Sequence, residues 1–554
     1  MSRRAVFVVL LLTIPLASVP AAEAWRAEGM AEIRAAGAEA GQDVRSLAQR
    51  GREVVGTVSD SRRLGRTAAV FGWLLEACDA AAEGDVGQAA QRAAVASARI
   101  RAAPPTPSLG YSFAREAIGT LAEVNADALE QAAQQGEEAY RRVVSREIRA
   151  LRTVPALAIM SAYDLKAAEG AEQHRKADAV VTVTGEDGGP LPNTEVEIRQ
   201  VSHDFLFGCA IPNFDSVGRW PQEARDAFTE RFARLFNYAT TENACKWANA
   251  EPQRGQHNYA QIDRMIEWCH EHGVRLKGHT LVWGNRGGAG VPRWLEPLPK
   301  GDVQQILEQR VRGMVRRFKG HIDYWDVVNE PTHCHWYDQN VDPDYTLHSL
   351  QWAREKNPEA FLIVNDFGNF RGNQAERFRD YLLDLKRRGA PLDGLGIQAH
   401  DPPTWYSPEL IYEVLDTLAE VGVDMHITEF TFRSNGEQIK GGFVEGHWTE
   451  EKHGEFYDMF YRMCFGHPQV KAITMWAMWD GSSWQRNGGV VRRDFTPKPA
   501  YEALDRLINR EWRTELTATT DAQGQVRFRG FRGEYEVRAR EGGGQRTLKV
   551  HVGD

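Results

Sequence analysis

The middle of the chain, roughly 203–511, alternates short apolar runs with longer amphipathic segments. The short runs are rich in β-branched and aromatic residues, as strands are. The longer segments, such as QIDRMIEWCHEHG and ELIYEVLDTLAEVG, repeat apolar residues at helical spacing. The eight candidate strands are FLFGCA (205–210), NYATT (237–241), RLKGH (275–279), DYWDVVN (323–329), FLIVN (361–365), GLGIQAH (394–400), DMHITE (424–429) and AITMW (472–476). Strands that alternate with helices predict parallel β-α-β units, and eight units predict an α/β fold, the closed (β/α)8 barrel of the triosephosphate-isomerase (TIM) type.

Two segments that flank this region follow a different pattern, in which apolar and polar residues alternate. Before it, AVVTV and TEVEI stand on either side of a Gly/Pro-rich turn, and after it QVRFRGF, EYEVRA and TLKVHV are separated by short turns. Alternation with a period of two predicts strands, but each segment has too few apolar residues to bury a core alone. We therefore predict that 178–202 and 512–554 form one small β-sandwich, which the barrel at 203–511 interrupts.

The region 25–177 is predicted to be α-helical. It is rich in Ala, Arg, Glu and Gln and poor in β-branched residues, a composition that favours helices. Its Arg-rich stretch RRLGR, at 62–66, is typical of a solvated surface, and no site is predicted in this region. The role of 25–177 stays open.

The first 24 residues have the parts of a secretory signal peptide. Arg3 and Arg4 precede an apolar run over 5–12, and small residues close the segment at Ala22-Glu23-Ala24. The apolar run is too short to span a bilayer, and no later segment approaches the roughly 18 apolar residues that a span needs. We expect 1–24 to be a cleaved signal peptide and the chain to be secreted or periplasmic, without a membrane span. The alternative is an uncleaved N-terminal anchor.

Charge and composition narrow the range of partners. The 554 residues carry a net charge of −9, which disfavours nucleic acid and anionic membrane surfaces as main targets. The 16 tryptophans and 15 tyrosines suit an uncharged ligand with flat faces. The six cysteines are scattered and lack the spacing of a disulfide framework, so most are expected to be buried free thiols, and a single disulfide stays open.

Polar and aromatic residues gather at the predicted carboxyl ends of the barrel strands, where active sites of this fold lie. Two strands end on a glutamate, Glu330 in WDVVNEP and Glu429 in DMHITEF, although burying a carboxylate is costly. The other strand ends supply Glu242, Asn243, Lys246, His279, Trp283, Asn329, Asp366, Gln398, His400, Trp476 and Trp484. Two carboxyl groups across a cleft lined by Trp, Gln, Asn and His are the arrangement that glycoside hydrolysis needs.

Seven motifs, in order along the chain, carry a resemblance to a known family. They are TENACKW (241–247), GHTLVW (278–283), WDVVNEP (325–331), IVNDFG (363–368), GIQAHD (396–401), HITEF (426–430) and MWAMWDGSSW (475–484). Over roughly 203–511 the chain resembles the family 10 glycoside hydrolases, the endo-1,4-β-xylanases, and its aromatic MWAMWDGSSW loop and trailing FRGFRGEYEV are similar to their plant-type branch. The resemblance implies a retaining enzyme that hydrolyses internal bonds of xylan or another β-1,4-linked polysaccharide, with no cofactor and no metal.

The resemblance also implies a role for each matching residue. Glu330 would be the general acid/base and Glu429 the nucleophile. Asn329 would hold the sugar 2-hydroxyl, and His400 would hydrogen-bond the nucleophile. The others would bind sugar: Lys246, His279, Trp283 and Gln398 around the reacting sugar, Glu242 and Asn243 one sugar further towards the non-reducing end, and Trp476 and Trp484 as walls of the glycone side.

One departure from the family pattern lies on the aglycone side. Phe367-Gly368 stands where many members have Tyr-Asn, so hydrogen bonding to the aglycone is expected to differ. The loop after the fourth strand, THCHWYDQNVDPDYT, is short, and the aglycone cleft is therefore expected to be more open.

Two stretches with histidine are interpreted as structural. His333-Cys334-His335 has poor spacing for metal ligands and is interpreted as a loop. His426 is out of step with Glu429 along its strand and is expected to face the helix layer.

Other functions stay open from the sequence. A transglycosylase or a glucan-active relative would use the same two glutamates, and a carbohydrate-binding protein without catalysis would keep the barrel. The presence of both glutamates and their neighbours argues against a silent protein. The preferred xylan decoration, binding by the β-sandwich, protein partners and the oligomeric state are not specified by the sequence.

Overall fold

The computed structural model describes residues 28–29, 31–32, 131–186, 188–441, 444, 446–541 and 544–553. The predicted signal peptide, 1–24, and most of the predicted helical region lie outside these residues. Within the described part of that region, α7 (Glu137–His174) is one continuous helix of 38 residues. The chain divides into two compact units, and the second, 171–406 with 410–554, holds the barrel and the flanking strands. No helix of the described residues has the length and apolar content to cross a membrane.

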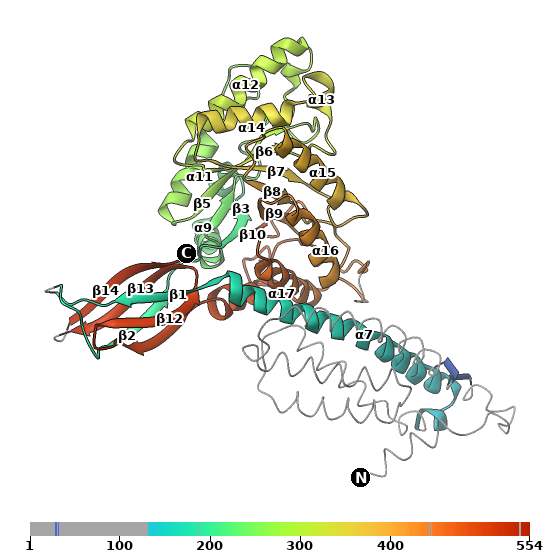
Figure 1. Ribbon diagram of the computed structural model, residues 1–554. Helices are drawn as coiled ribbons and strands as arrows, with labels where there is room; N and C mark the ends of the chain where they lie inside the picture. Colours follow the sequence, from blue (N-terminus) through green and yellow to red (C-terminus); the bar gives the residue numbers. More distant parts are fainter. Residues whose placement is uncertain are drawn as a thin grey trace. The chain divides into compact units, whose positions relative to one another are not determined.

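The second unit is built on a closed barrel of eight strands, as predicted (Figure 1). Around the barrel the order is β10-β3-β4-β5-β6-β7-β8-β9, and every neighbouring pair is parallel. The strands are β3 (Leu206–Ala210), β4 (Tyr238–Thr240), β5 (Arg275–Trp283), β6 (Tyr324–Asn329), β7 (Phe361–Asp366), β8 (Gly394–Ile397), β9 (Asp424–Phe430) and β10 (Val470–Met475). Strands buried on both faces need apolar residues at successive positions, which explains why the predicted strands appear as short continuous apolar runs.

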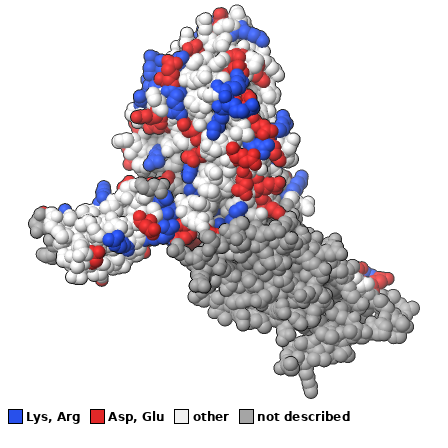
Figure 2. Space-filling view, in the orientation of Figure 1, with Lys and Arg blue, Asp and Glu red and all other residues white. Residues whose placement is uncertain are grey.

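Helices connect these strands and cover the barrel (Figure 1). They are α8 (Phe214–Val217), α9 (Gln222–Leu235), α10 (Trp247–Ala250), α11 (Ala260–Glu271), η3 (Arg293–Leu295), α12 (Lys300–Arg317), α13 (Trp336–Asn340), α14 (Tyr345–Lys356), α15 (Gln374–Arg387), α16 (Pro408–Ala419), α17 (Glu450–Gly466), α18 (Pro499–Arg506) and η4 (Leu507–Glu511). In α12 the buried residues include Val303, Leu307, Val311 and Met314, which recur at the three- and four-residue spacing of one helix face. Over the described face of the barrel, acidic and basic side chains intermingle (Figure 2).

The strands on either side of the barrel in sequence pair with each other, as predicted. One sheet has the order β11-β2-β13-β14 and a second pairs β1 with β12. The strands are β1 (Lys176–Thr182), β2 (Glu195–Gln200), β11 (Glu515–Thr519), β12 (Gln525–Phe531), β13 (Gly533–Glu541) and β14 (Gly544–Val552). Val181 lies opposite Val526 in one sheet, and Ile198 lies opposite Leu516 in the other. These residues share one apolar core, so the C-terminal strands complete a sandwich that the N-terminal strands begin.

Removal of residues 512–554 is expected to lower the melting temperature by about 10 °C and to increase binding of an apolar dye. The truncation leaves Val181, Val196 and Ile198, all buried in the intact chain, without the strands that cover them. Burial of each such side chain is worth roughly 1.5–3 kcal/mol, and several such losses shift the melting temperature by this order. Calorimetry and dye fluorescence measure both effects. A chain that lacks only 553–554, beyond β14, is the control, and a truncation at 512 that melts like the full chain contradicts the pairing.

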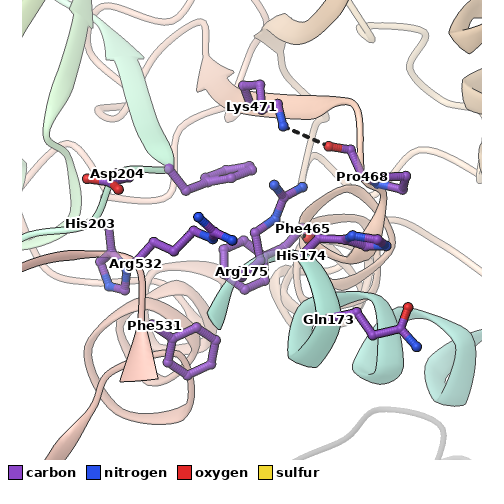
Figure 3. Close-up of a pocket in the computed structure, with 11 residues that line it drawn as sticks. Gln173, His174, Arg175, His203, Asp204, Phe465, Pro468, Lys471, Phe531 and Arg532 are labelled. Carbon is purple, nitrogen blue, oxygen red and sulfur yellow. Dashed lines mark hydrogen bonds between the residues drawn. The ribbon is translucent and has the colours of Figure 1, made fainter. Parts of the chain in front are cut away.

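Arg175, between α7 and β1, lies among the residues that line a pocket (Figure 3) and binds backbone carbonyls near the start of β10. Its Nε donates to the carbonyl of Phe465 at 2.7 Å, and its Nη2 donates to the carbonyls of His467 and Val470. These carbonyls lie at and just beyond the end of α17, where a helix carries partial negative charge. Burial, with Arg532 nearby, lowers the pKa of Arg175 to about 10. Arg175 lines a pocket of about 450 Å³ together with Lys471 and Arg532. Because the Arg175 guanidinium is used to bind backbone carbonyls, we interpret its role as structural.

The prediction that His426 faces the helix layer is wrong. Its ring lies 6.3 Å from that of Tyr238 on β4 and 6.1 Å from that of Tyr324 on β6. Neither strand is a neighbour of β9, so these contacts are made across the barrel interior. The register of β9 against β10 shifts between Ile427 and Phe430, which breaks strict alternation and lets both His426 and Glu429 face inwards. Burial lowers the pKa of His426 to about 3, so this histidine is neutral.

Candidate active site

The two predicted catalytic glutamates lie at the carboxyl ends of their strands, as the sequence indicates. Glu330 directly follows β6, and Glu429 is the next-to-last residue of β9. Both are buried, with 9% and 6% of their surfaces exposed. Glu330 has a φ of 56°, in the left-handed region that residues with a side chain seldom adopt. Its backbone N–H donates to the carbonyl of Asn365 at 2.6 Å, which holds this conformation against the next strand. Such backbone strain is concentrated at functional sites.

Glu330 accepts hydrogen bonds from two residues predicted to belong to the site. The indole Nε1 of Trp283 donates to Oε2 at 2.8 Å, and the amide Nε2 of Gln398 donates to Oε1 at 3.0 Å. The Gly-rich loop after β5 packs on this indole: a Cβ at Gly288 would lie 2.2 Å from the Trp283 ring. Glycine is therefore required there for a steric reason, and the loop holds Trp283 against Glu330.

Glu429 is surrounded by groups that favour its charged form. Asn365 Nδ2 donates to Oε1 at 2.9 Å, and His400 Nε2 lies 3.5 Å from Oε2. Burial opposes ionisation of this carboxyl, but the neighbouring His400 and His279 outweigh the effect of burial, so the pKa of Glu429 is lowered. In return, although burial works against it, the Glu429 carboxylate raises the pKa of His400.

Amide side chains link the two glutamates. Asn329 Oδ1 accepts from Asn365 Nδ2 at 2.8 Å and from Gln398 Nε2 at 3.3 Å. Those same amides donate to Glu429 and Glu330, respectively. These two hydrogen bonds fix which way the Asn329 amide points, and its NH₂ group is the part that can donate to a ligand. Gln398 Oε1 in turn accepts from His400 Nε2 at 2.6 Å, which closes the network.

Asn365 is a site residue that the sequence reasoning missed. It is fully buried in β7, and Thr428 Oγ1 donates to its Oδ1 at 2.6 Å, which fixes the amide so that Nδ2 points to Glu429. The available signal was its place in IVNDFG, where it directly precedes the strand-end residue Asp366.

The segment after β4 forms one side wall. Lys246 Nζ donates to Asn243 Oδ1 at 2.8 Å, and Asn243 Nδ2 donates to Glu242 Oε1 at 2.9 Å. The ammonium lies 5.0 Å from the centre of the Trp283 ring, so this wall touches the residue that holds Glu330. Burial raises the pKa of Glu242 to about 7, so near neutral pH it can both donate to and accept from a hydroxyl group. Burial also lowers the pKa of Lys246.

His279 and the two tryptophans complete the predicted set. His279 Nδ1 lies 2.9 Å from Asp326 Oδ2, and its ring meets that of Trp476 edge-on at 4.9 Å. The Trp484 ring meets that of His400 edge-on at 5.3 Å, and 56% of Trp484 is exposed. Trp484 therefore leaves a large apolar surface open to a ligand beside His400, the histidine next to Glu429. Asp326, also missed from the sequence, is fully buried in WDVVNEP and pairs with both His279 and Lys277.

The turn after Glu330 is fixed to the end of β7 by Asp366. Its Oδ2 accepts from the Thr332 hydroxyl at 2.7 Å, and its Oδ1 lies 2.7 Å from His333 Nδ1. This hydrogen bond raises the pKa of His333. Phe367 stacks on the His333 ring at 3.9 Å. At Phe367, where the chain departs from the family pattern, the side chain is therefore an apolar ring that packs on a histidine. Among the described residues, no group of three or more His, Cys, Asp or Glu side chains could hold a metal ion.

Comparison with known proteins points to the same region. The sequence profile of glycosyl hydrolase family 10 matches residues 199–506. Endo-1,4-beta-xylanase 1 of Arabidopsis thaliana is 27% identical over 383 residues, which cover 68% of this chain and 38% of that protein. Endo-1,4-beta-xylanase B of Thermotoga neapolitana is 30% identical over 306 residues, 52% of this chain and 85% of that protein. The crystal structure of native xylanase 10B from Thermotoga maritima is 26% identical, covers 56% of this chain and 96% of its own, and has a TM-score of 0.49.

The matches differ in how much of each chain they cover. The chain spans well under half of the length of the Arabidopsis protein. The part of this chain that matches the Arabidopsis protein is nevertheless longer than the part that matches the family profile. The segment that matches the family profile, 199–506, contains Glu330, Glu429 and every other predicted site residue.

Proposed function

Because the chain belongs to glycosyl hydrolase family 10, we propose that its barrel is a retaining endo-1,4-β-xylanase that cleaves internal bonds of xylan by double displacement. The observation that carries this proposal is the pair of buried carboxyl groups, Glu330 and Glu429, held by different donors and joined through Asn329 and two further amides. Each carboxyl can then do a separate task at one pH.

In the first step, the Glu429 carboxylate attacks the anomeric carbon while Glu330 gives its proton to the glycosidic oxygen. The bond from the sugar to the leaving oxygen breaks as a bond to Glu429 forms. His400, which lies beside Glu429, contributes to the lowered pKa of that carboxyl and so favours its ionised form. The contribution of Glu429 to catalysis is therefore lost only as the pH falls through that lowered value. Asn329 donates its free NH₂ to the sugar 2-hydroxyl.

In the second step, Glu330, now ionised, removes a proton from a water molecule that attacks the glycosyl-enzyme. The same side chain serves as acid and then as base. The product leaves with the configuration of the substrate, because the anomeric carbon has been inverted twice.

Several features support an uncharged β-1,4-linked polysaccharide as the substrate. The exposed face of Trp484 and the indole of Trp476 suit pyranose rings, and the amides and Glu242 suit sugar hydroxyls. Acidic and basic side chains are mixed on the visible barrel surface rather than gathered in one field (Figure 2). The Arabidopsis and Thermotoga relatives carry the description endo-1,4-beta-xylanase, which makes xylan the substrate of choice.

Incubation with xylan is expected to release reducing sugar, and NMR of the first product is expected to show the β-anomer. Retention requires the two carboxyl groups to lie about 5–5.5 Å apart, as against ~6.5–9.5 Å for inversion. Glu330→Gln, which keeps the size of the side chain, is the matched negative control. An α-anomer formed first would rule out double displacement.

The same assay separates the alternatives. Release of sugar from cellulose alone would indicate a glucan-active enzyme, and transfer products in place of hydrolysis would indicate a transglycosylase. Binding to xylan without release would indicate a silent binding protein. Export by the segment 1–24 is part of the proposal, and mass spectrometry of the chain recovered outside the cytoplasm, beginning near residue 25, would test it.

A further inference from the structure

Glu330 has a third hydrogen-bond donor, which the two catalytic steps do not use. The Sγ of Cys334 lies 3.3 Å from Oε2 of Glu330. That oxygen also accepts the indole N–H of Trp283, whereas Oε1 accepts only from Gln398. The carboxyl group is therefore held unequally, with two donors on one oxygen and one donor on the other.

The backbone fixes the position of this thiol. The N–H of Cys334 donates to the carbonyl of Glu330 at 2.8 Å, so a tight turn brings the two side chains together. The loop after β5 packs directly on this turn, because a Cβ at Gly284 would lie only 2.4 Å from the Cys334 carbonyl oxygen. Trp283 and Cys334 thus reach Oε2 from two loops that interlock.

The thiol is suited to donate rather than to react. Burial, together with the nearby Glu330 carboxyl, raises the pKa of Cys334 to about 12. The S–H proton is therefore retained over the whole working range of a glycosidase, and a thiol with its proton is a weak donor.

A carboxylate has two acceptor positions on each oxygen. Trp283 and Cys334 together fill both positions on Oε2, and Gln398 fills one on Oε1. We propose that Cys334 is a positioning residue that occupies the second acceptor position of Oε2 and so confines the transferable proton of Glu330 to Oε1. This inference rests on the proposed function, because the proton in question is the one that passes from Oε1 to the leaving oxygen as the sugar–oxygen bond breaks.

Other charged groups around this carboxyl are common to all the Cys334 variants. They are Lys246 after β4, Asp366 at the end of β7, His400 after β8, Glu429 in β9 and His333 in the same turn. A difference in activity between the variants that lack a donor at position 334 and the variant that keeps one therefore reports the loss of the hydrogen bond.

The test compares Cys334→Val, which keeps the bulk and removes the donor, with Cys334→Ser, which keeps a donor. On xylan, Cys334→Val is expected to lower kcat/KM about five-fold, the size of one modest hydrogen bond. On an aryl xylobioside with a very acidic phenol, which needs no proton to leave, kcat/KM should stay within about two-fold. Cys334→Ser should resemble the unchanged chain on both substrates.

Cys334→Ala, which only removes atoms, is the second variant without a donor, in case valine does not fit. The inference is overturned if both donor-free variants keep the xylan kcat/KM of the unchanged chain. It is equally overturned if Val, Ala and Ser variants all lose activity alike on xylan and on the aryl substrate, since that indicates a purely structural role. Failure of the unchanged chain to cleave xylan would instead count against the proposed function itself.

Discussion

Replacement of Glu330 by alanine is expected to remove nearly all hydrolysis of xylan while leaving the attack on an activated substrate intact. A sugar alcohol leaves poorly without a proton, and general acid catalysis is worth roughly 10²–10⁴-fold. A phenol with a low pKa leaves without help, so Glu330→Ala should still form the glycosyl-enzyme quickly from an aryl xylobioside. The second step then lacks its base and the intermediate accumulates. Stopped-flow detection of the phenol burst and mass spectrometry of the intermediate measure both effects.

Added azide is expected to restore turnover of the aryl xylobioside by Glu330→Ala. The small anion fits the space left by the Glu330 carboxyl and needs no base, so it should speed turnover and give a β-azide. The product has this configuration because azide attacks from the face that water uses. Glu420→Ala, an exposed glutamate paired with Arg379, is the control and should behave like the unchanged chain. Loss of the phenol burst in Glu330→Ala, with a burst retained in a Glu429 variant, would reverse the two roles.

The barrel could be predicted because parallel strands buried on both faces are apolar at successive positions, and β3, Leu206–Ala210, is buried at every residue. The rim could be predicted from the rule that polar residues at carboxyl strand ends meet in space. His426 shows where this reasoning fails. Strict alternation would place His426 and Glu429 on opposite faces of β9, but a register shift between Ile427 and Phe430 lets both side chains face the barrel interior. Such a shift arises from how β9 pairs with β10, which is encoded in tertiary packing rather than in the local pattern.

A second limit of prediction from the sequence concerns the partners of individual side chains. Asn365 and Asp326 were visible as polar residues inside apolar strands, but their partners, Glu429 and His279, come from other strands. Cys334 was interpreted as part of an ordinary loop, because its spacing suits no metal. Its contact with Glu330 depends on a turn and on close packing at Gly284, and neither is apparent from residue types.

Replacement of Glu429 by alanine is expected to abolish cleavage of both xylan and the aryl xylobioside. An acidic leaving group compensates for a missing acid but not for a missing nucleophile, and loss of a nucleophile costs on the order of 10⁵-fold or more. No glycosyl-enzyme should be trapped, because the atom that forms the bond is gone. The variant should keep its fold, since alanine removes a buried charge together with the group that carries it and leaves the apolar neighbours of β9 in place.

Azide distinguishes this variant from Glu330→Ala by stereochemistry. In Glu429→Ala the anion fills the space on the nucleophile side and attacks the aryl xylobioside directly, so the expected product is an α-azide formed by one inversion. In Glu330→Ala two inversions give the β-azide. NMR of the two products therefore assigns each carboxyl to one face of the sugar without relying on rates alone. A β-azide from Glu429→Ala, or cleavage of xylan by both variants at near the unchanged rate, would mean that WDVVNEP and DMHITEF do not carry the reaction.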